Sequence, residues 1–361
     1  MNLAKEKFNP VFHAEQILSK YYGHHSKSAR GIITPIDSGV PAIYSNGYFD
    51  SSYSIRKIER TITAHLGTKA STTRVNDIVN QIIRSTYTDM DSSHIQKYRN
   101  FVCLENGLLN LKTLELEKPH PSKYVSWKIP VAYNPDCDIE PIHQYIESMV
   151  KPEHVDKIQE HCGNVLSNHY LTKKLLYAVG PNDGGKSTFF NVFREIIGRD
   201  NCCTLTLDEL GEKFTNAQLY NKHVNICSDV PYSFNKKHYG RIKNLTGDDY
   251  ITLQFKGKDA FNYRPVAKQF FSGNQIPKIN LDYVDGGFYR RWDFVDFPYS
   301  FTKKENIFER FTTPEMKSSL LNWMIEGYQR LVENKWEITN VDAIDERSEE
   351  HTSELQSPLC I

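Results

Sequence analysis

The chain has 361 residues, 39% of them hydrophobic and 12% aromatic, which is enough for packed cores in two or three structural units. No apolar run approaches the roughly 18 residues of a membrane span, and the N-terminus lacks the apolar segment of a secretory signal. The seven cysteines show no metal-ligand spacing. We therefore expect a cytoplasmic protein with no membrane partner. Since the net charge is zero, a nucleic-acid role would need Lys and Arg concentrated on one surface.

The first 140 residues alternate helical and strand patterns. Apolar residues recur at helical spacing in VFHAEQILSKYY, SIRKIERTITAHLG and VNDIVNQIIRST. Asn46-Gly47 and Asn106-Gly107 are hairpin-turn signals between apolar segments of strand length. We predict an α+β accessory domain over residues 1–140, which ends in a linker rich in Pro and Asp.

From residue 141 the pattern changes to short apolar strands that alternate with helices, which is typical of a parallel α/β core. The predicted strands are LLYAV (175–179), VNICSDV (224–230), KQFFSGN (268–274) and FVDFP (294–298). Helical spacing returns in SSLLNWMIEGYQRLVENK. We predict an α/β core with a mainly parallel sheet over 141–300 and a C-terminal helical segment over 301–346.

Residues 347–361 show no apolar period, and they resemble a sequencing adaptor translated in frame. We interpret them as an artefact tail and expect the helical segment to be truncated. An ordinary polar tail is the alternative.

A phosphate-binding loop follows the first core strand. LLYAV runs directly into GPNDGGKS, the pattern G-x-x-x-x-G-K-S, and a helical segment follows. In this pattern backbone N–H groups and the helix N-terminus hold phosphates, Lys186 reaches the β- and γ-phosphates, and Ser187 ligates Mg²⁺. We therefore predict an ATP site with Mg²⁺. Its residues are Gly180, Pro181, Asn182, Asp183, Gly184, Gly185, Lys186, Ser187 and Thr188.

Two polar residues stand at the ends of later strands. Asp229 closes VNICSD, where a carboxylate can hold Mg²⁺ and orient water. Asn274 closes FFSGN, where an amide can contact the γ-phosphate or position the attacking water. In isolation such residues are mostly turn formers or helix caps, so both assignments depend on the phosphate loop.

The order of these motifs resembles superfamily 3 helicases, which include poxvirus and phage or plasmid helicase-primases. GPNDGGKS, VNICSD and FFSGNQIP resemble the family's motifs A, B and C. YRNFVCLENGLLNLKTLELEKP is similar to the N-terminal domain beside phage and large-DNA-virus helicases, and LLNWMIEGYQRL to the helix after the motor. Motif B departs from the family, because Ser228 stands where a second acid is usual.

The resemblance implies a P-loop NTPase core of the AAA+ type and a hexameric ring that moves 3′-to-5′ along single-stranded DNA and unwinds duplex DNA. It also implies DNA contacts from Lys256 and Lys258 on a hairpin, with Phe255 and Phe261 as aromatic candidates. An arginine after motif C would reach a neighbour's γ-phosphate. Arg291 is favoured for this role, and Arg290 is second.

Two other functions fit the same loop. A small-molecule or nucleotide kinase would transfer the γ-phosphate without DNA or a ring, and an ATP-dependent loader or origin-recognition protein would bind DNA without unwinding it. For the helicase we expect a primase or polymerase partner, in a prokaryotic host cell or at a viral replication site.

Overall fold

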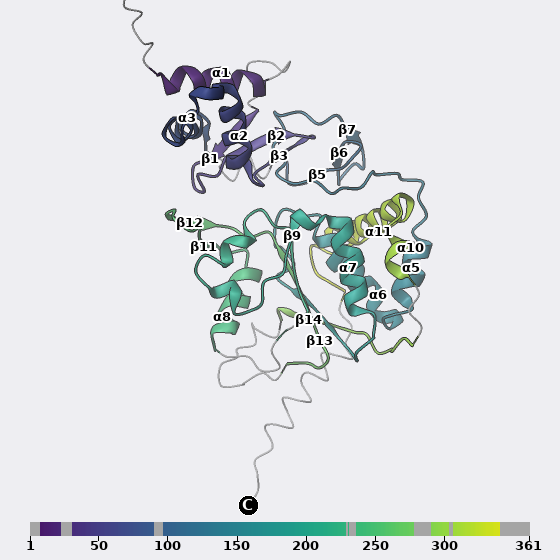
Figure 1. The fold of residues 1–361 in the computed structure, drawn as a ribbon. Coiled ribbons are helices and arrows are strands. Elements are labelled where there is room, and N and C mark those ends of the chain that lie inside the picture. The colour runs from purple at the N-terminus through teal and green to yellow at the C-terminus, as the bar shows by residue number, and fades with distance from the viewer. Residues whose placement is uncertain are drawn as a thin grey trace, which may run out of the picture. The chain divides into compact units, whose positions relative to one another are not determined.

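The computed structural model describes residues 8–22, 31–89, 97–228, 230, 236–277, 290–302 and 306–339. The chain forms two compact units (Figure 1). Unit 1 comprises Met1–Cys103, Gly107–Asn110 and Glu115–Lys128, and unit 2 comprises Leu104–Asn106, Leu111–Leu114 and Ile129–Ile361. We predict a domain boundary near residue 140, where a helix begins at Glu140, whereas the last change from unit 1 to unit 2 follows Lys128.

Unit 1 is an α+β assembly of helices and two small sheets. The helices are α1 (Pro10–Tyr22), α2 (Ser54–Leu66), η1 (Gly67–Lys69) and α3 (Thr72–Ser85). The first sheet has the order β3-β2-β1-β4, from β1 (Ile32–Pro35), β2 (Ala42–Ser45), β3 (Tyr48–Asp50) and β4 (Tyr87–Thr88). The second contains β5 (Phe101–Cys103), β6 (Leu108–Asn110) and β7 (Leu116–Glu117). Ile17, Ile58 and Ile78, one from each α-helix, are fully buried together, as the helical spacing predicts.

Both predicted Asn-Gly turns join antiparallel strands. Asn46 and Gly47, with φ of 52° and 91°, connect β2 to β3, since this turn needs left-handed backbone at both central positions. Asn106-Gly107 connects β5 to β6. Unit 1 therefore contains both helices and antiparallel strand pairs.

Unit 2 contains a five-stranded parallel sheet with the order β14-β8-β13-β10-β9. Its strands are β8 (Leu175–Val179), β9 (Cys202–Cys203), β10 (Val224–Cys227), β13 (Lys268–Gly273) and β14 (Trp292–Asp296). A separate antiparallel hairpin is formed by β11 (Ile251–Gln254) and β12 (Ala260–Tyr263). The helices are α5 (Glu140–Glu147), η2 (Pro152–His154), α6 (Val155–Asn164), α7 (Lys186–Ile197), η3 (Arg199–Asn201), η4 (Glu209–Gly211), η5 (Asn216–Leu219), α8 (Lys236–Thr246), α10 (Ile307–Phe311) and α11 (Pro314–Glu333).

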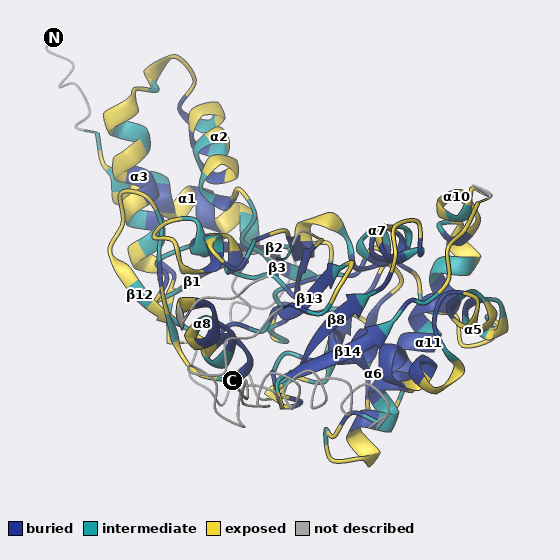
Figure 2. Ribbon diagram, turned by 90° about the horizontal axis from the view of Figure 1, so that it is seen from below, coloured by how far each residue is buried: buried dark blue, intermediate teal, exposed yellow. Residues whose placement is uncertain are grey.

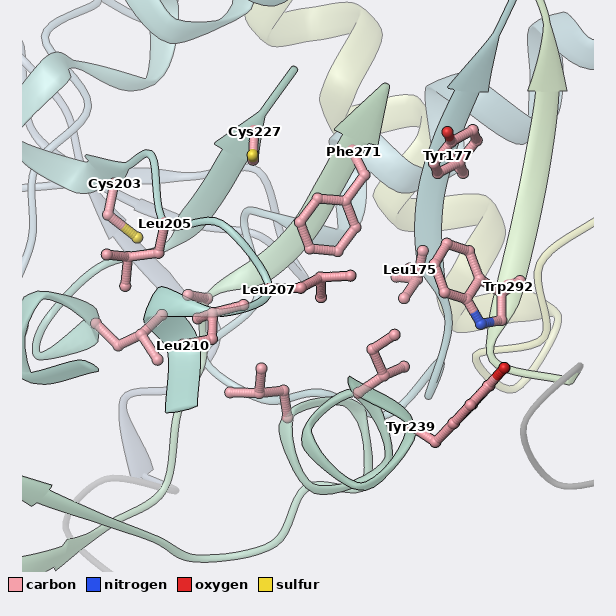
Figure 3. Close-up of a cluster of buried hydrophobic side chains, with 14 of the residues drawn as sticks. Leu175, Tyr177, Cys203, Leu205, Leu207, Leu210, Cys227, Tyr239, Phe271 and Trp292 are labelled. Atoms are coloured by element: carbon pink, nitrogen blue, oxygen red, sulfur yellow. The ribbon is translucent and has the colours of Figure 1, made fainter. Parts of the chain in front are cut away.

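Apolar side chains cover both faces of this sheet, and Figure 2 shows β8, β13 and β14 as buried. On one face Tyr177, Phe271 and Trp292 pack with Tyr239 of α8 (Figure 3). On the other face Phe270 stacks on Phe193 of α7 with ring centroids 5.3 Å apart. Successive residues of a strand point to opposite faces, so Phe270 packs on the α7 side of the sheet and Phe271 on the α8 side. Burial on both faces explains why these strands read as continuous apolar runs.

Helices α6 and α11 pack at close range because each contributes a glycine. A Cβ on Gly163 would lie 2.3 Å from the backbone N of Tyr328, and a Cβ on Gly327 would lie 2.3 Å from the backbone O of Gln159. The predicted C-terminal helix is thus confirmed, and it forms part of the layer over the sheet. Over the described ranges, no helix has the length and apolar character that crossing a membrane requires.

Three of the four predicted strands have wrong boundaries, and the smallest difference is at β13, which ends at Gly273 and not at residue 274. The strand predicted to start at Phe294 begins at Trp292, because Asp293 is 1% exposed and is paired inside the core. The strand predicted to reach residue 230 ends at Cys227, where its ladder with β13 stops at the pair Cys227 and Phe271. Ser228 lies beyond that ladder, at a cavity.

Candidate nucleotide-binding site

The predicted phosphate loop connects β8 to α7, and backbone geometry requires its glycines. A Cβ on Gly180 would lie 2.1 Å from the carbonyl O of Phe297, which no rotamer change could relieve. Gly185 is the residue before α7 and has a φ of 86°, where a Cβ would also lie 2.9 Å from Met149 Sδ. The loop therefore passes close to its neighbours, with the N-terminus of α7 beside it.

Lys186, the first residue of α7, is 8% exposed. Its ammonium donates hydrogen bonds to the carbonyl oxygens of Gly180 at 2.7 Å and Pro181 at 2.6 Å. Burial lowers the pKa of this amine. Lys186 forms no ion pair within the described part of the chain, so a bound anion would supply the missing counter-charge.

The segment that follows β14 braces the loop from outside. Phe297 N donates to Val179 O at 2.7 Å, and Phe301 N donates to Asp183 O at 3.2 Å. Ser300 Oγ donates to the carbonyl O of Asn182 at 3.4 Å. The loop is therefore held in shape by backbone contacts as well as by Lys186, which is the preorganisation that a phosphate site needs.

A cavity of about 1400 Å³ opens over the loop and the carboxyl ends of three strands. Its polar side is lined by Asn182, Asp183, Gly184, Gly185, Lys186, Ser187, Thr188, Ser228, Ser272, Gly273 and Asn274. Its less polar side includes Pro141, Tyr145, Met149, Phe301, Ile307 and Phe308. The cavity exceeds the roughly 300–1,000 Å³ of common ligand pockets, which leaves room for a whole nucleotide.

The structure brings most of the predicted nucleotide residues to one edge of the sheet. Because β13 lies between β8 and β10, Asn274 stands between the phosphate loop and Ser228. Asn274 is exposed to the cavity. Asp229, the predicted magnesium ligand, lies outside the described residues.

The apolar wall was missed by sequence reasoning. Tyr145 belongs to α5, thirty-five residues before the loop, and it stacks on Phe311 of α10 with centroids 4.3 Å apart. Burial raises the pKa of the Tyr145 hydroxyl. These residues belong to no motif, so only the fold shows that α5 and α10 meet beside the loop.

Arg290 and Arg291 lie at the opposite, amino edge of the sheet. They directly precede β14, whose five residues run parallel to β8. At about 3.3 Å per residue, the strand separates Arg291 from the loop edge by about 16 Å. Arg291 Nη1 donates to Thr246 Oγ1 at 2.8 Å, at the end of α8, whereas Arg290 is exposed. The structure therefore does not bring either arginine to the loop of its own chain.

The predicted DNA-binding hairpin is present as β11 and β12, with Leu253 paired to Phe261. Lys256 and Lys258 are exposed in its turn, and Gly257 between them has a φ of 77°. Phe255 stacks on Phe261 with centroids 5.6 Å apart, and Tyr220 packs edge-on against both rings. The two lysines therefore project from a hairpin whose aromatic candidates brace each other.

The amino edge of the sheet also contains a buried ionic cluster. Asp293 of β14 accepts from His161 Nε2 at 2.7 Å and pairs with Lys157 Nζ at 2.9 Å, and all three residues are 1% exposed. Lys174 Nζ approaches the same carboxylate at 3.8 Å. Burial alone would raise the pKa of Asp293, but His161 and the two lysines hold it well below its usual range.

Lys268 is also buried, and it forms no ion pair within the described residues. Its ammonium donates to Ser167 O at 2.8 Å and Val266 O at 2.9 Å, and it lies 5.5 Å from the ring centroid of Tyr170. Burial lowers the pKa of Lys268 to about 7. These groups satisfy one another inside the fold, so we assign them to stability.

Comparison with known proteins finds two family matches, in separate segments of the chain, and similar solved structures. Residues 15–151 match a family described as D5 N terminal like, and residues 178–291 match a family of unknown function. No curated protein matches the chain. One apo structure of the NrS-1 C-terminal region is 15% identical with a TM-score of 0.52, and the match covers 90% of this chain and 69% of that chain. Another is 13% identical with a TM-score of 0.50, covering 90% and 68%.

At such low identity, these likenesses concern the fold alone. The chain has a mixed α/β fold with a five-stranded parallel sheet, like the NrS-1 region, and contains a segment similar to the D5 N terminal like family.

Proposed function

We propose that this chain is a replication protein of the phage or viral type that acts as an ATP-driven DNA helicase. The observation that carries the proposal is Lys186, a buried amine in a glycine-bounded loop between β8 and α7, facing a cavity large enough for a nucleotide. A buried cation that is bonded only to carbonyl oxygens, at a helix N-terminus, is suited to a phosphate.

In the proposed complex, the triphosphate lies along the loop and the base lies against Tyr145, Met149 and Phe308. Lys186 exchanges the carbonyl oxygens of Gly180 and Pro181 for phosphate oxygens. Asn274 directs its amide toward the γ-phosphate or the attacking water.

Ser187 and Asp229 are the proposed magnesium ligands. Ser187 lines the cavity, as the motif requires. Magnesium, when bound, neutralises charge that develops on the phosphates. Mg²⁺ usually takes only one or two protein ligands and completes its shell with water and phosphate, so a small ligand set fits this chemistry.

The active site is completed by a second chain in this proposal. Because Arg291 lies about 16 Å from the loop edge of its own sheet, it cannot stabilise the γ-phosphate there. A neighbouring subunit would supply it, as in arginine fingers that act in trans. The family resemblance implies that six chains close a ring.

The hairpin supplies the proposed link to DNA. Lys256 and Lys258 lie on its exposed turn, where ammonium groups can follow backbone phosphates. In a ring, movement of this hairpin with each ATP cycle would draw one strand through the channel. Its aromatic base, Phe255 with Phe261 and Tyr220, would keep the turn rigid.

The comparisons support the replication part of the proposal. The segment that matches the D5 N terminal like family includes the stretch whose sequence resembles the domain beside phage and large-DNA-virus helicases. The NrS-1 likeness spans 90% of this chain and so includes both units. The expected primase or polymerase partner remains part of the proposal.

Two rival functions make different predictions. A kinase needs an acceptor site beside the γ-phosphate and no second chain, so its ATPase activity per molecule would be independent of concentration. A loader would share the ring and the DNA response but would not separate strands.

The test is the ATPase rate of the full chain against protein concentration, with and without single-stranded DNA, followed by strand displacement on a forked duplex. We expect specific activity to rise with concentration and with DNA, and the fork to be unwound. A flat, DNA-independent rate would favour the kinase. DNA-stimulated hydrolysis without displacement would favour the loader.

A further inference from the structure

The exposed face of α2 in unit 1 is basic. Its five exposed residues are Arg56, Lys57, Arg60, Thr63 and Ala64, and the helix's one acid, Glu59, is half-buried. Tyr53, directly before the helix, is 71% exposed. Residues three, four and seven positions apart share one face of a helix, so Tyr53, Arg56, Lys57 and Arg60 form a continuous stripe. We refer to these four residues as the α2 stripe.

Two cations of the α2 stripe are not neutralised within the described part of unit 1. Lys57 pairs with Asp50 at 2.5 Å. Arg56 and Arg60 form no ion pair there, and the Arg56 guanidinium lies 5.8 Å from the ring centroid of Tyr53. The stripe therefore presents two guanidinium groups beside an exposed aromatic ring.

The backbone conformation of Tyr53 is unfavourable, and Tyr53 does not stabilise the N-terminus of α2. Its φ of 53° and ψ of 22° are left-handed, a conformation that is unfavourable for a residue with a Cβ. It also occupies the N-cap position of α2 and makes no side-chain capping bond, although Ser, Thr, Asp, Asn and Gly are the favoured residues there. A strained, exposed tyrosine at this position suggests a function for its ring outside the fold.

The charge of the chain is divided between the two units. Unit 1 contains 16 Lys and Arg against 10 Asp and Glu, a net charge of +6. The remaining 28 basic and 34 acidic residues give unit 2 a net charge of −6. The zero net charge of the whole chain thus conceals a basic unit, and the α2 stripe lies on it.

We infer that the α2 stripe binds single-stranded nucleic acid, with Tyr53 stacked on a base and Arg56 and Arg60 in contact with phosphates. Sequence-independent binding of single strands combines these two features, because every base has a face that can stack and every nucleotide has a charge. The choice of nucleic acid as the ligand rests on the proposed function. The α2 stripe is a second contact surface, which lies in unit 1 and is independent of Lys256 and Lys258 in unit 2.

The experiment measures binding of a fluorescent single-stranded oligothymidylate to the full chain over a range of salt concentrations. The double variant Arg56→Gln with Arg60→Gln removes two phosphate contacts. The slope of log affinity against log salt should then become shallower by about 1.4, since each contact to a single strand contributes about 0.7. The matched control is Lys69→Gln with Arg84→Gln, which removes two exposed cations of the same unit outside the stripe and should keep the wild-type slope.

Tyr53→Gly distinguishes a role of the Tyr53 ring in binding single strands from a role in stabilising the fold. Glycine tolerates the left-handed backbone and is an acceptable N-cap, so the midpoint of thermal unfolding should stay the same or rise. Loss of base stacking should weaken binding about tenfold, and Tyr53→Phe should restore it. If Tyr53→Gly lowers the unfolding midpoint and leaves affinity unchanged, the ring is structural and the inference is overturned.

The hairpin variant Lys256→Gln with Lys258→Gln distinguishes failure of the stripe inference from failure of the proposed function. If it weakens binding while the stripe variants bind like wild type and like their control, the stripe inference fails and the proposed function stands. If the wild-type chain binds no single strands at all, both fail. Basal ATPase activity should be unchanged in the stripe variants, because Tyr53, Arg56 and Arg60 lie outside the nucleotide cavity.

Discussion

The two edges of the five-stranded sheet in unit 2 differ in how their charged side chains are paired. At the carboxyl edge, the hydrogen bonds that Lys186 makes within the described residues go to carbonyl oxygens of its own loop, and Asn274 faces an open cavity. At the amino edge, Asp293 is enclosed by His161 and Lys157. Charged groups that are satisfied by each other stabilise the fold, whereas those left with an unmatched charge at a cavity are suited to a ligand. Substitutions at the two edges should therefore affect different measurements.

A large loss of activity is expected from Arg291→Ala. If the arginine acts on a neighbour's γ-phosphate, kcat for ATP should fall about 10³-fold or more, as for other arginine fingers. ATP affinity and chain association should change little, since Arg291 lies outside the cavity. Arg290→Ala is the matched control and should retain most of the activity. Normal hydrolysis by Arg291→Ala would show that the finger is elsewhere.

Lys186→Ala should abolish ATP hydrolysis and leave the fold intact, because the lysine bonds only to the carbonyl oxygens of Gly180 and Pro181. Equilibrium binding of a fluorescent ATP analogue should weaken at least tenfold, and urea unfolding should match wild type. Unaltered nucleotide binding would remove the phosphate loop from the site.

Asp293→Asn should mainly affect stability, with a loss of about 3–5 kcal/mol of unfolding free energy, because it leaves the buried ammonium of Lys157 without its carboxylate partner. The carboxylate's contribution is present above its unfolded pKa of about 4 and is lost as pH falls through the lower native pKa. Urea unfolding from pH 6 to pH 2 should therefore show a decline below about pH 4 that is steeper in wild type than in the variant. An equal acid slope in both would mean that Asp293 is not the group responsible.

A smaller effect is expected from Thr246→Val, which keeps the shape of the side chain but removes its hydrogen bond to Arg291. We expect a change in kcat of about fivefold to tenfold, corresponding to roughly 1–1.5 kcal/mol, through a less well-positioned arginine. Thr246→Ser should restore the rate. If the valine and serine variants have equal rates, the hydrogen bond does not position Arg291.

The carboxyl edge could be predicted from the sequence because its chemistry is local. GPNDGGKS contains the turn, the lysine and the helix start within eight residues, and the Lys-Gly-Lys turn likewise marked the hairpin. The start of β14 was predicted two residues too late because of Asp293. A polar residue in a strand pattern suggests a loop unless its buried partners are known. Those partners lie on α6, more than 130 residues earlier.

The apolar wall of the cavity and the α2 stripe depend on tertiary structure. Tyr145 and Phe308 meet at the cavity only after α5 and α10 have packed beside the loop. The helical pattern of α2 was visible in the sequence, but the left-handed backbone and exposure of Tyr53 were not. Helix α8 was also missed, since its apolar residues Tyr239, Ile242 and Leu245 stand among several basic ones.

Mixing two inactive variants tests directly whether each ATP site is completed by the arginine of a second chain. Lys186→Ala retains the arginine but lacks a working loop, whereas Arg291→Ala retains the loop but lacks the arginine. In mixed assemblies, an Arg291→Ala loop can receive Arg291 from a Lys186→Ala neighbour. If the site is completed in trans, ATPase activity should reappear on mixing and be greatest near equal proportions. If every mixture is as inactive as its components, although both variants bind single-stranded DNA and assemble, completion of the site in trans is contradicted.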